Sequence, residues 1–218
     1  MAFDAYDYDD LEQSEHLKRW LRRYGSALAL GMLLIVAAIL GYGQWRRHQA
    51  AQTVRAASLY WQARQAELTH QASMADTLTR MLTKGYPDTA YAVFAAAAQA
   101  RRLVQEKRYP QALTALHWAV THSKDPSLQA LFQLRSARVL LAEGEAGQAL
   151  SALDSVTDPA YRGVGGELRG DAQLALGHSQ QAREAYQAAL DALGPDLPQS
   201  HVVRLKLDDL AVAGKPGT

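Results

Sequence analysis

The side chains best suited to chemistry in this sequence are its histidines, because imidazole binds metal ions and transfers protons near neutral pH. The seven are His16, His48, His70, His117, His122, His178 and His201. None belongs to a His-Glu-x-x-His run, and His117 and His122 are five residues apart, which is the wrong helical spacing for a shared metal ion. We therefore interpret the histidines as surface or partly packed residues.

The other motifs that could carry catalysis are incomplete. The segment 163–166 is rich in glycine, but it lacks the Lys-Ser/Thr of a phosphate-binding loop and follows no predicted strand. The chain has no cysteine and no serine in a Gly-x-Ser-x-Gly elbow, which excludes disulfides and thiol chemistry and argues against a serine hydrolase. The sequence predicts a protein that is not an enzyme and has no catalytic, cofactor-binding or metal-binding residues.

An uncharged stretch, residues 24–45, dominates the N-terminal part of the chain. As a helix it would span about 30 Å, the thickness of a bilayer's hydrocarbon core. Tyr24, Tyr42 and Trp45 lie where interfacial aromatic residues are expected, and basic residues flank both ends. We predict a transmembrane helix over 24–45, because buried helices of soluble proteins rarely run this long without a charge. Small residues that favour helix packing recur within it at Ala27, Gly31, Ala37 and Gly41.

The flanks of this stretch indicate its orientation. Residues 1–23 combine an acidic tail with an amphipathic juxtamembrane segment, in which Leu17, Trp20 and Leu21 share one helical face with Tyr24. Four basic residues lie within six positions before the stretch and two after it, which favours an N-terminus on the cytoplasmic side and a domain over 46–218 on the other side of the membrane. A cleavable signal peptide is the competing interpretation, but the apolar run is longer than a usual signal core.

The rest of the chain is rich in alanine and predicts an all-α domain. Residues 49–70 form one expected helix and 77–84 a short second one. Three segments, 98–113, 136–150 and 169–183, then align with steps of 37 and 33 residues, close to the 34-residue tetratricopeptide repeat. The predicted repeat-packing residues are Ala100, Ala112, Leu116 and Ala119, then Ala137, Ala149, Leu153 and Val156, then Gly170, Ala182, Tyr186 and Ala189.

This register predicts three helix pairs and a final capping helix. The pairs cover 89–106 with 110–121, 127–143 with 147–156, and 162–176 with 179–193. The last helix, 198–211, would cover the end of the solenoid with Val202, Val203, Leu205 and Leu210. The fold class is therefore all-α, with an N-terminal transmembrane helix followed by a tetratricopeptide-like α-solenoid.

Solenoids of this kind bind peptides or proteins on the concave face formed by the first helix of each pair. The candidate partner-binding residues are Tyr91, Phe94, Gln99, Arg102, Gln133, Arg135, Arg138, Arg169 and Gln173, for each of which a plain surface or core role is the alternative. From residue 50 onward the chain carries 17 Lys/Arg and 16 Asp/Glu without a basic stripe, so no nucleic-acid partner is expected.

Several segments in this order resemble a known family. They are LEQSEHLKRWLRRYGSALALG before and within the apolar stretch, RAASLYWQA after it, and LRGDAQLALGHSQQAREAYQAAL, with Leu205-Lys206-Leu207 near the end. The chain is similar along nearly its whole length to the YfgM-type ancillary subunits of the bacterial SecYEG translocon. The resemblance implies a single-pass inner-membrane protein with a periplasmic repeat domain and no catalytic residues.

The resemblance also implies the partners. They are the SecYEG translocon and a membrane-bound periplasmic chaperone. We expect unfolded exported polypeptides as a further partner. The sequence thus predicts a non-catalytic, membrane-anchored scaffold that links exported polypeptides to periplasmic chaperones. A second hypothesis is a regulatory adaptor that holds a signalling protein through its cytoplasmic tail or its repeat domain.

Overall fold

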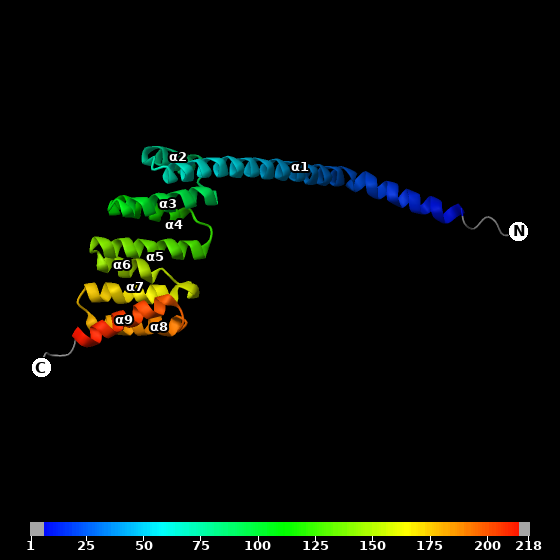
Figure 1. The fold of residues 1–218 in the computed structure, drawn as a ribbon. Coiled ribbons are helices and arrows are strands. Elements are labelled where there is room, and N and C mark those ends of the chain that lie inside the picture. Colours follow the sequence, from blue (N-terminus) through cyan, green and yellow to red (C-terminus); the bar gives the residue numbers. More distant parts are fainter. Residues whose placement is uncertain (1–6, 214–218) are drawn as a thin grey trace. The chain divides into compact units, whose positions relative to one another are not determined.

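The computed structural model describes the backbone of residues 7–213, and the side chains of residues 24, 30–42, 44–46 and 49–210. The chain divides into two compact units, Met1–Gln52 and Thr53–Thr218. The described residues contain helices and no strand (Figure 1). The elements are α1 (Asp7–Leu68), α2 (Ala72–Gly85), α3 (Ala90–Gln105), α4 (Tyr109–His122), α5 (Pro126–Glu143), α6 (Ala146–Asp154), the 3-10 helix η1 (Pro159–Tyr161), α7 (Arg162–Ala175), α8 (Ser179–Ala192) and α9 (Pro198–Ala213).

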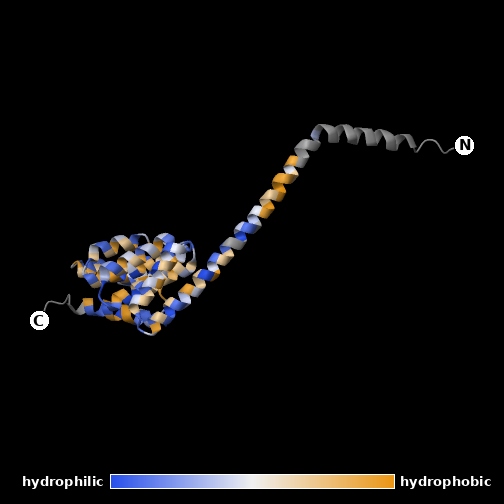
Figure 2. Cartoon of the chain, turned by 90° about the horizontal axis from the view of Figure 1, so that it is seen from above, coloured by the Kyte–Doolittle hydropathy of each residue, from blue (hydrophilic) through white to orange (hydrophobic). Residues whose placement is uncertain are grey.

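The first unit contains the N-terminal part of α1, in which a run of apolar residues stands out in Figure 2. The large apolar side chains of this run are 49–70% exposed: Leu30, Met32, Leu33, Leu34, Ile35, Val36, Ile39 and Leu40. Gly31 and Gly41 also face open space, because a Cβ added to either would meet nothing within 4 Å. Among the described residues, none of the helices combines the length and the hydropathy that a membrane crossing requires. Residues 25–29 and 43 of the predicted span, Ala27 included, lie outside the described side chains.

The second unit is a series of helix pairs joined by one kind of turn. The turns after α1, α3, α5 and α7 each contain a residue with positive φ: His70 (57°), Lys107 (55°), Gly144 (89°) and Gly177 (81°). In each turn the amide of the next residue donates to the carbonyl five positions before it, at 2.8–2.9 Å, which closes the preceding helix. The four positions are separated by 37, 37 and 33 residues, so the same turn recurs once per repeat.

This recurrence shows one helix pair more than the three predicted from the sequence. The last part of α1 and α2 form the additional pair, and α2 begins at Ala72, ahead of the expected start at residue 77. Its buried residues, shifted by 37 positions, match the first predicted repeat: Ala63, Ala75, Thr79 and Leu82 correspond to Ala100, Ala112, Leu116 and Ala119. Ala63, Ala66, Ala75 and Leu78 pack together and join α1 to α2.

The core of the repeats is built from small side chains that let helices cross closely. All of the predicted repeat-packing residues are buried except Val156, which is partly buried against the cluster around Leu153. The closest crossing joins α7 to α8, where a Cβ added to Gly170 would lie 2.3 Å from the ring of Tyr186. A repeat position that is alanine in the earlier pairs is therefore glycine here, because Tyr186 fills the space.

Helix α9 packs on α8 and α7 through apolar contacts and ion pairs. Val203 and Leu210 are buried with Tyr186, whereas Val202 and Leu205, also predicted to cover the solenoid, are 45% and 65% exposed. Lys206 supplies the polar contacts: its ammonium group lies 2.8 Å from Glu167 and 2.7 Å from Asp171, both on α7.

The charges of this cluster are stabilised mutually. Burial raises the pKa of Glu167, but hydrogen bonds from Lys206 and Gln199 outweigh it and hold the pKa below its usual range. Burial lowers the pKa of Lys206, and its hydrogen bonds to Asp171 and Glu167 more than reverse this. Both groups are therefore charged in the folded state near neutral pH.

Candidate binding groove

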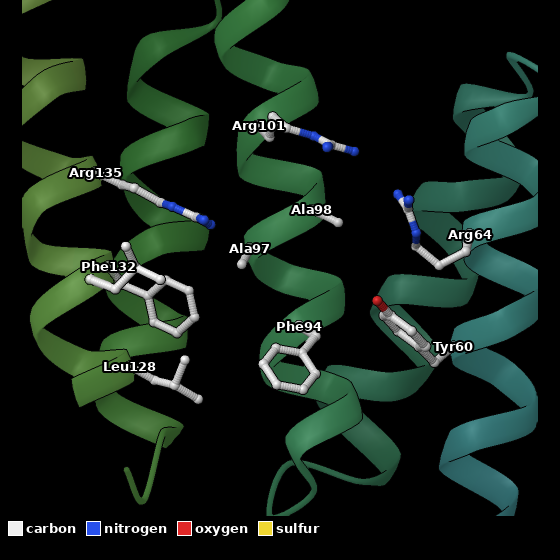
Figure 3. Close-up of a pocket in the computed structure, with 10 residues that line it drawn as sticks. Tyr60, Arg64, Phe94, Ala97, Ala98, Arg101, Leu128, Phe132 and Arg135 are labelled. Carbon is white, nitrogen blue, oxygen red and sulfur yellow. The ribbon is translucent and has the colours of Figure 1, made fainter. Parts of the chain in front are cut away.

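The best candidate site is a groove between the first helices of successive pairs, which we call the arginine groove. It consists of two adjoining cavities of about 280 and 350 Å³ that share Ala97, Arg101 and Arg135. The first lies between the C-terminal part of α1, α3 and α5 (Figure 3), and the second continues along α3 and α5 toward α4. Its arginines are Arg64, Arg101, Arg135 and Arg138.

The floor of the groove is apolar because α3 presents alanines where its neighbours present larger side chains. Ala97 and Ala100 are buried, so α3 leaves room between the larger residues of α1 and α5. Phe132 from α5 is 2% exposed, whereas Phe94 from α3 is 38% exposed and presents its ring to the groove. In Figure 3 the arginine heads occupy one end of the first cavity, and the rings and Leu128 the other.

The groove has an excess of positive charge. Arg64 pairs with Glu67, one turn along α1, and Arg101 lies 4.0 Å from the same carboxylate. The Arg135 guanidinium lies 5.7 Å from the centre of the Phe132 ring, a cation–π arrangement. Among the described side chains, neither Arg135 nor Arg138 has an ion pair within 4.0 Å. Glu67 thus lies near two of the four guanidinium groups, and the charge of Arg138 helps to lower the pKa of Glu167 on α7.

The structure brings three of the predicted partner-binding residues into this groove, namely Phe94, Arg135 and Arg138. Tyr91 instead packs with Tyr60, with ring centroids 5.7 Å apart, in an apolar cluster beside the groove. Gln133 is partly buried on α5 and lines neither cavity.

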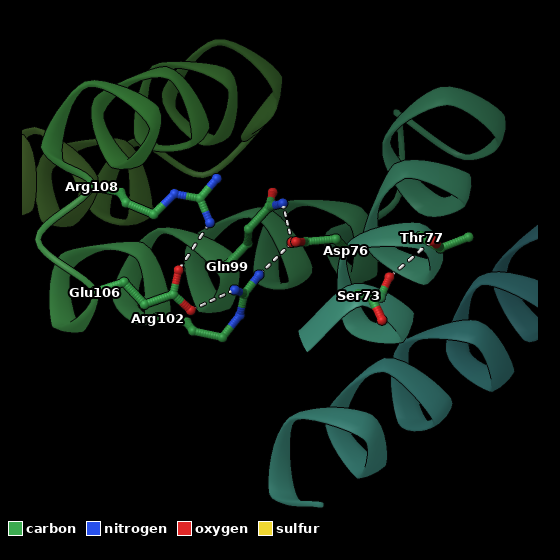
Figure 4. Close-up of polar contacts among 7 residues, drawn as sticks. All are labelled: Ser73, Asp76, Thr77, Gln99, Arg102, Glu106 and Arg108. Carbon is green, nitrogen blue, oxygen red and sulfur yellow. Dashed lines mark hydrogen bonds and ion pairs between the residues drawn. The ribbon is translucent and has the colours of Figure 1, made fainter. Parts of the chain in front are cut away.

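Two further candidates belong to a polar network that ties α2 to α3 (Figure 4). Asp76 accepts hydrogen bonds from Gln99, at 2.7 Å, and from Arg102. Arg102 also donates to Glu106, which Arg108 contacts from the other side at 3.0 Å. The hydrogen bonds from Arg108 and Arg102 lower the pKa of Glu106. Gln99 and Arg102 therefore hold two helices together.

The last two candidates also serve the fold. The Arg169 guanidinium donates to the Leu153 carbonyl at 2.8 Å, across the junction between α6 and α7. The Gln173 amide oxygen lies 2.9 Å from Nδ1 of His178 in the following turn. Neither side chain lines the arginine groove.

The sequence analysis missed Tyr60, Arg64 and Arg101, although a signal for the arginines was present. Arg64, Arg101 and Arg138 are 37 residues apart and each follows a buried alanine of the repeat, at Ala63, Ala100 and Ala137. Because the first helix pair had not been recognised, Arg64 was not aligned with the other two. In the last pair this position holds Asp171, which pairs with Lys206.

The succession of helix pairs joined by one recurring turn defines an α-solenoid of repeated helix pairs. Residues 18–212 match the family described as "Tetratricopeptide repeat-like domain", and the chain belongs to this family. The predicted all-α, tetratricopeptide-like fold is thereby confirmed.

The particular relatives of the chain agree with the resemblance found in its sequence. It is 28% identical to the ancillary SecYEG translocon subunit of Haemophilus influenzae, over 94% of this chain and 100% of that protein. The protein of the same name from Escherichia coli is also 28% identical, over 92% of this chain and 96% of that protein. The one from Neisseria gonorrhoeae is 26% identical, over 94% and 99%.

A solved structure supports the fold independently. The MamA protein "MamA RS-1 ArsTM double mutant" superposes with a TM-score of 0.54 at 15% identity, covering 74% of this chain and 97% of that one.

Proposed function

We propose that this protein is a non-catalytic adaptor of the SecYEG translocon, anchored by residues 24–45, whose repeat domain links exported polypeptides to a membrane-bound chaperone in the periplasm. The relatives that carry the name of a translocon subunit match this chain over 92–94% of its length, which supports the translocon as the partner. The observation that carries the adaptor role is the arginine groove, an apolar floor with charged walls of the kind that solenoids use to bind other chains.

The anchor is supported by the apolar run of α1. Large side chains such as Leu33, Ile35 and Leu40 are more than half exposed, and a row of exposed aliphatic side chains is stable only when an apolar environment covers it. Acyl chains or the helices of a membrane partner supply that environment. The basic residues that precede residue 24 support a cytoplasmic N-terminus, and with it a periplasmic repeat domain.

The experiment that tests the adaptor role is crosslinking and copurification from intact membranes. Full-length protein should copurify with the translocon, and a photo-reactive amino acid in place of Phe94 should crosslink to a chaperone or an exported chain. The matched control is the same amino acid at Arg183, an exposed position on α8 outside the groove. Equal crosslinking at both positions would show that the groove is not the binding site. If the translocon is absent from the copurified proteins, it is not the partner.

A second experiment separates the anchor from the domain. Replacing residues 26–43 by an unrelated apolar helix retains the membrane attachment and removes the small residues Gly31, Ala37 and Gly41. If the translocon association depends on packing of this helix, the replacement should reduce copurification and leave groove crosslinking unchanged. Reporter fusions at the two ends of this variant and of the natural chain check that the orientation is the same.

A further inference from the structure

The arginines of the groove follow the repeat, and this regularity indicates what the groove binds. Arg64, Arg101 and Arg138 occupy the same position in three successive repeats, and Arg135 lies one turn before Arg138. Core packing does not require a positive charge at this position, because the acidic Asp171 occupies it in the last repeat. Three guanidinium groups in a row along one groove therefore point to a ligand.

From this arrangement we propose that the arginine groove binds an acidic segment of a partner protein, in which carboxylates flank a large apolar side chain. The inference rests on the proposed function only in placing a partner in this groove. It adds the chemistry of the bound segment, which the adaptor role leaves open.

The charge balance of the groove carries the first half of the proposal. Glu67 is shared by Arg64 and Arg101, while among the described side chains neither Arg135 nor Arg138 has an ion pair within 4.0 Å. Arg138 is attracted to Glu167 on α7 only at longer range. A guanidinium offers planar, paired donors that match a carboxylate, so unpaired arginines at the wall of a groove select acidic groups. They would repel a basic segment, which gives specificity as well as affinity.

The apolar floor carries the second half. Phe94 is 38% exposed, and Leu128 and Leu131 line the same cavity in partly exposed positions. The cavity holds about 280 Å³, near the lower end of the range for ligand pockets, so it suits one or two side chains. Because the arginine heads lie at one end of the cavity and the rings at the other, carboxylates and an apolar side chain can be bound together (Figure 3).

The test uses full-length protein in micelles of a neutral detergent and a fluorescent peptide, GSDEDFLDEDSG, followed by fluorescence anisotropy. Two peptides serve as controls: GSKKKFLKKKSG retains the apolar pair and reverses the charge, and GSDEDSSDEDSG retains the charge and removes the apolar pair. We expect the first peptide to bind at least about tenfold more tightly than either control. The basic peptide loses charge-assisted hydrogen bonds, each of which contributes more than the 1.4 kcal/mol that a factor of ten requires, and the other control loses the burial of the apolar pair. Binding should weaken as salt rises.

Variants show whether the groove is responsible. Arg135→Gln with Arg138→Gln should weaken binding of the acidic peptide about tenfold or more, and Phe94→Ser should weaken it without changing the salt dependence. The control pair, Arg183→Gln with Arg204→Gln, removes the same charge from exposed positions on α8 and α9 and should have little effect. Equal melting temperatures would show that the variants are folded.

The outcomes distinguish this inference from the proposed function. If the basic peptide binds as well as the acidic one, or if both arginine pairs have the same effect, the inference is wrong, whether or not the translocon copurifies. If the acidic peptide binds in the groove but the protein does not copurify with the translocon, the inference stands and the proposed function fails.

Discussion

Gly170→Ala offers the sharpest test of how the repeats pack. A Cβ at this position would lie 2.3 Å from two carbon atoms of the Tyr186 ring and 2.8 Å from a third, where about 3.4 Å is the ordinary limit of contact. Tyr186 is 1% exposed, and its hydroxyl donates to Asp171 at 2.7 Å. The ring therefore cannot retreat without giving up this hydrogen bond or disturbing the packing of α8 on α9.

The expected magnitude follows from three effects. Overpacking a core typically costs about 1–3 kcal/mol, and losing the tyrosine hydrogen bond costs about 1 kcal/mol more. Against this, alanine stabilises a helix interior by about 0.8–1 kcal/mol relative to glycine. The free energy of unfolding should therefore fall by about 1–3 kcal/mol in the Gly170→Ala variant.

The assay is denaturant unfolding of the full-length protein in micelles, followed by circular dichroism. The matched control is Gly147→Ala on α6, where an added Cβ meets nothing within 4 Å and the substitution should stabilise the protein slightly. Combining Gly170→Ala with Tyr186→Leu should cost less than the sum of the two changes, because the smaller side chain removes the collision. If Gly170→Ala is as stabilising as Gly147→Ala, the close crossing of α7 and α8 is wrong.

Three other predictions concern the turns, the C-terminal ion cluster and the helix crossings. Lys107→Gly should stabilise the protein by about 1 kcal/mol and Gly144→Ala should destabilise it similarly, since both positions have positive φ; urea midpoints measure both. Because the pKa of Glu167 is lowered in the fold, its contribution to the free energy of unfolding is present above about pH 4.3 and is lost as pH falls through the folded pKa. The pKa of Lys206 is raised, so its contribution to the same free energy is complete below about pH 10.4 and is lost as pH rises through the folded pKa. Lys206→Met should flatten the dependence of the melting temperature on pH at both ends, and an unchanged profile would contradict this coupling. Ala149→Arg should unfold or loosen the domain, because this alanine is fully buried and a large unpaired charge there costs several kcal/mol; an unchanged melting temperature would contradict the repeat register.

Much of the solenoid could be predicted from the sequence because its repeat is marked by small residues. The predicted helices 89–106 and 127–143 correspond to Ala90–Gln105 and Pro126–Glu143. The structure adds a capping residue at each start: Thr89 accepts from the amide of Ala92, and Asp125 from that of Ser127 at 2.9 Å. Gly144 and Gly177 then mark two of the ends.

The first helix pair was missed because its turn carries no such mark. His70 adopts the left-handed conformation that glycine adopts at positions 144 and 177, and the stretch before α2 contains neither glycine nor proline. Histidine is enriched among the non-glycine residues with positive φ, but only a few per cent of non-glycine residues adopt positive φ, so one histidine is a weak signal. The signal for this pair is the 37-residue spacing of the repeat. Counted back from Ala100 and Ala112, it leads to Ala63 and Ala75.

The contacts of two candidate partner-binding residues also depend on the first helix pair. Gln99 and Arg102 lie on the first helix of their pair and were assigned to partner binding on that ground. In the structure both side chains donate hydrogen bonds to Asp76 on α2, the second helix of the first pair, and their role in partner binding stays a prediction. Helical periodicity assigns a side chain to a face, but only the neighbouring helix decides whether that face is free.

The position that carries Arg64, Arg101 and Arg138 shows how one repeat position serves two purposes. In the first three repeats it places a guanidinium at the groove, where few carboxylates oppose it. In the last repeat it is Asp171, which accepts hydrogen bonds from Lys206 and Tyr186 and so joins α9 to the end of the solenoid. The change of sign coincides with the change of neighbour, because the last repeat packs against α9, whereas the earlier ones line an open groove. An arginine at position 171 would face Lys206 and weaken the attachment of α9, so the row of arginines ends where the capping helix begins.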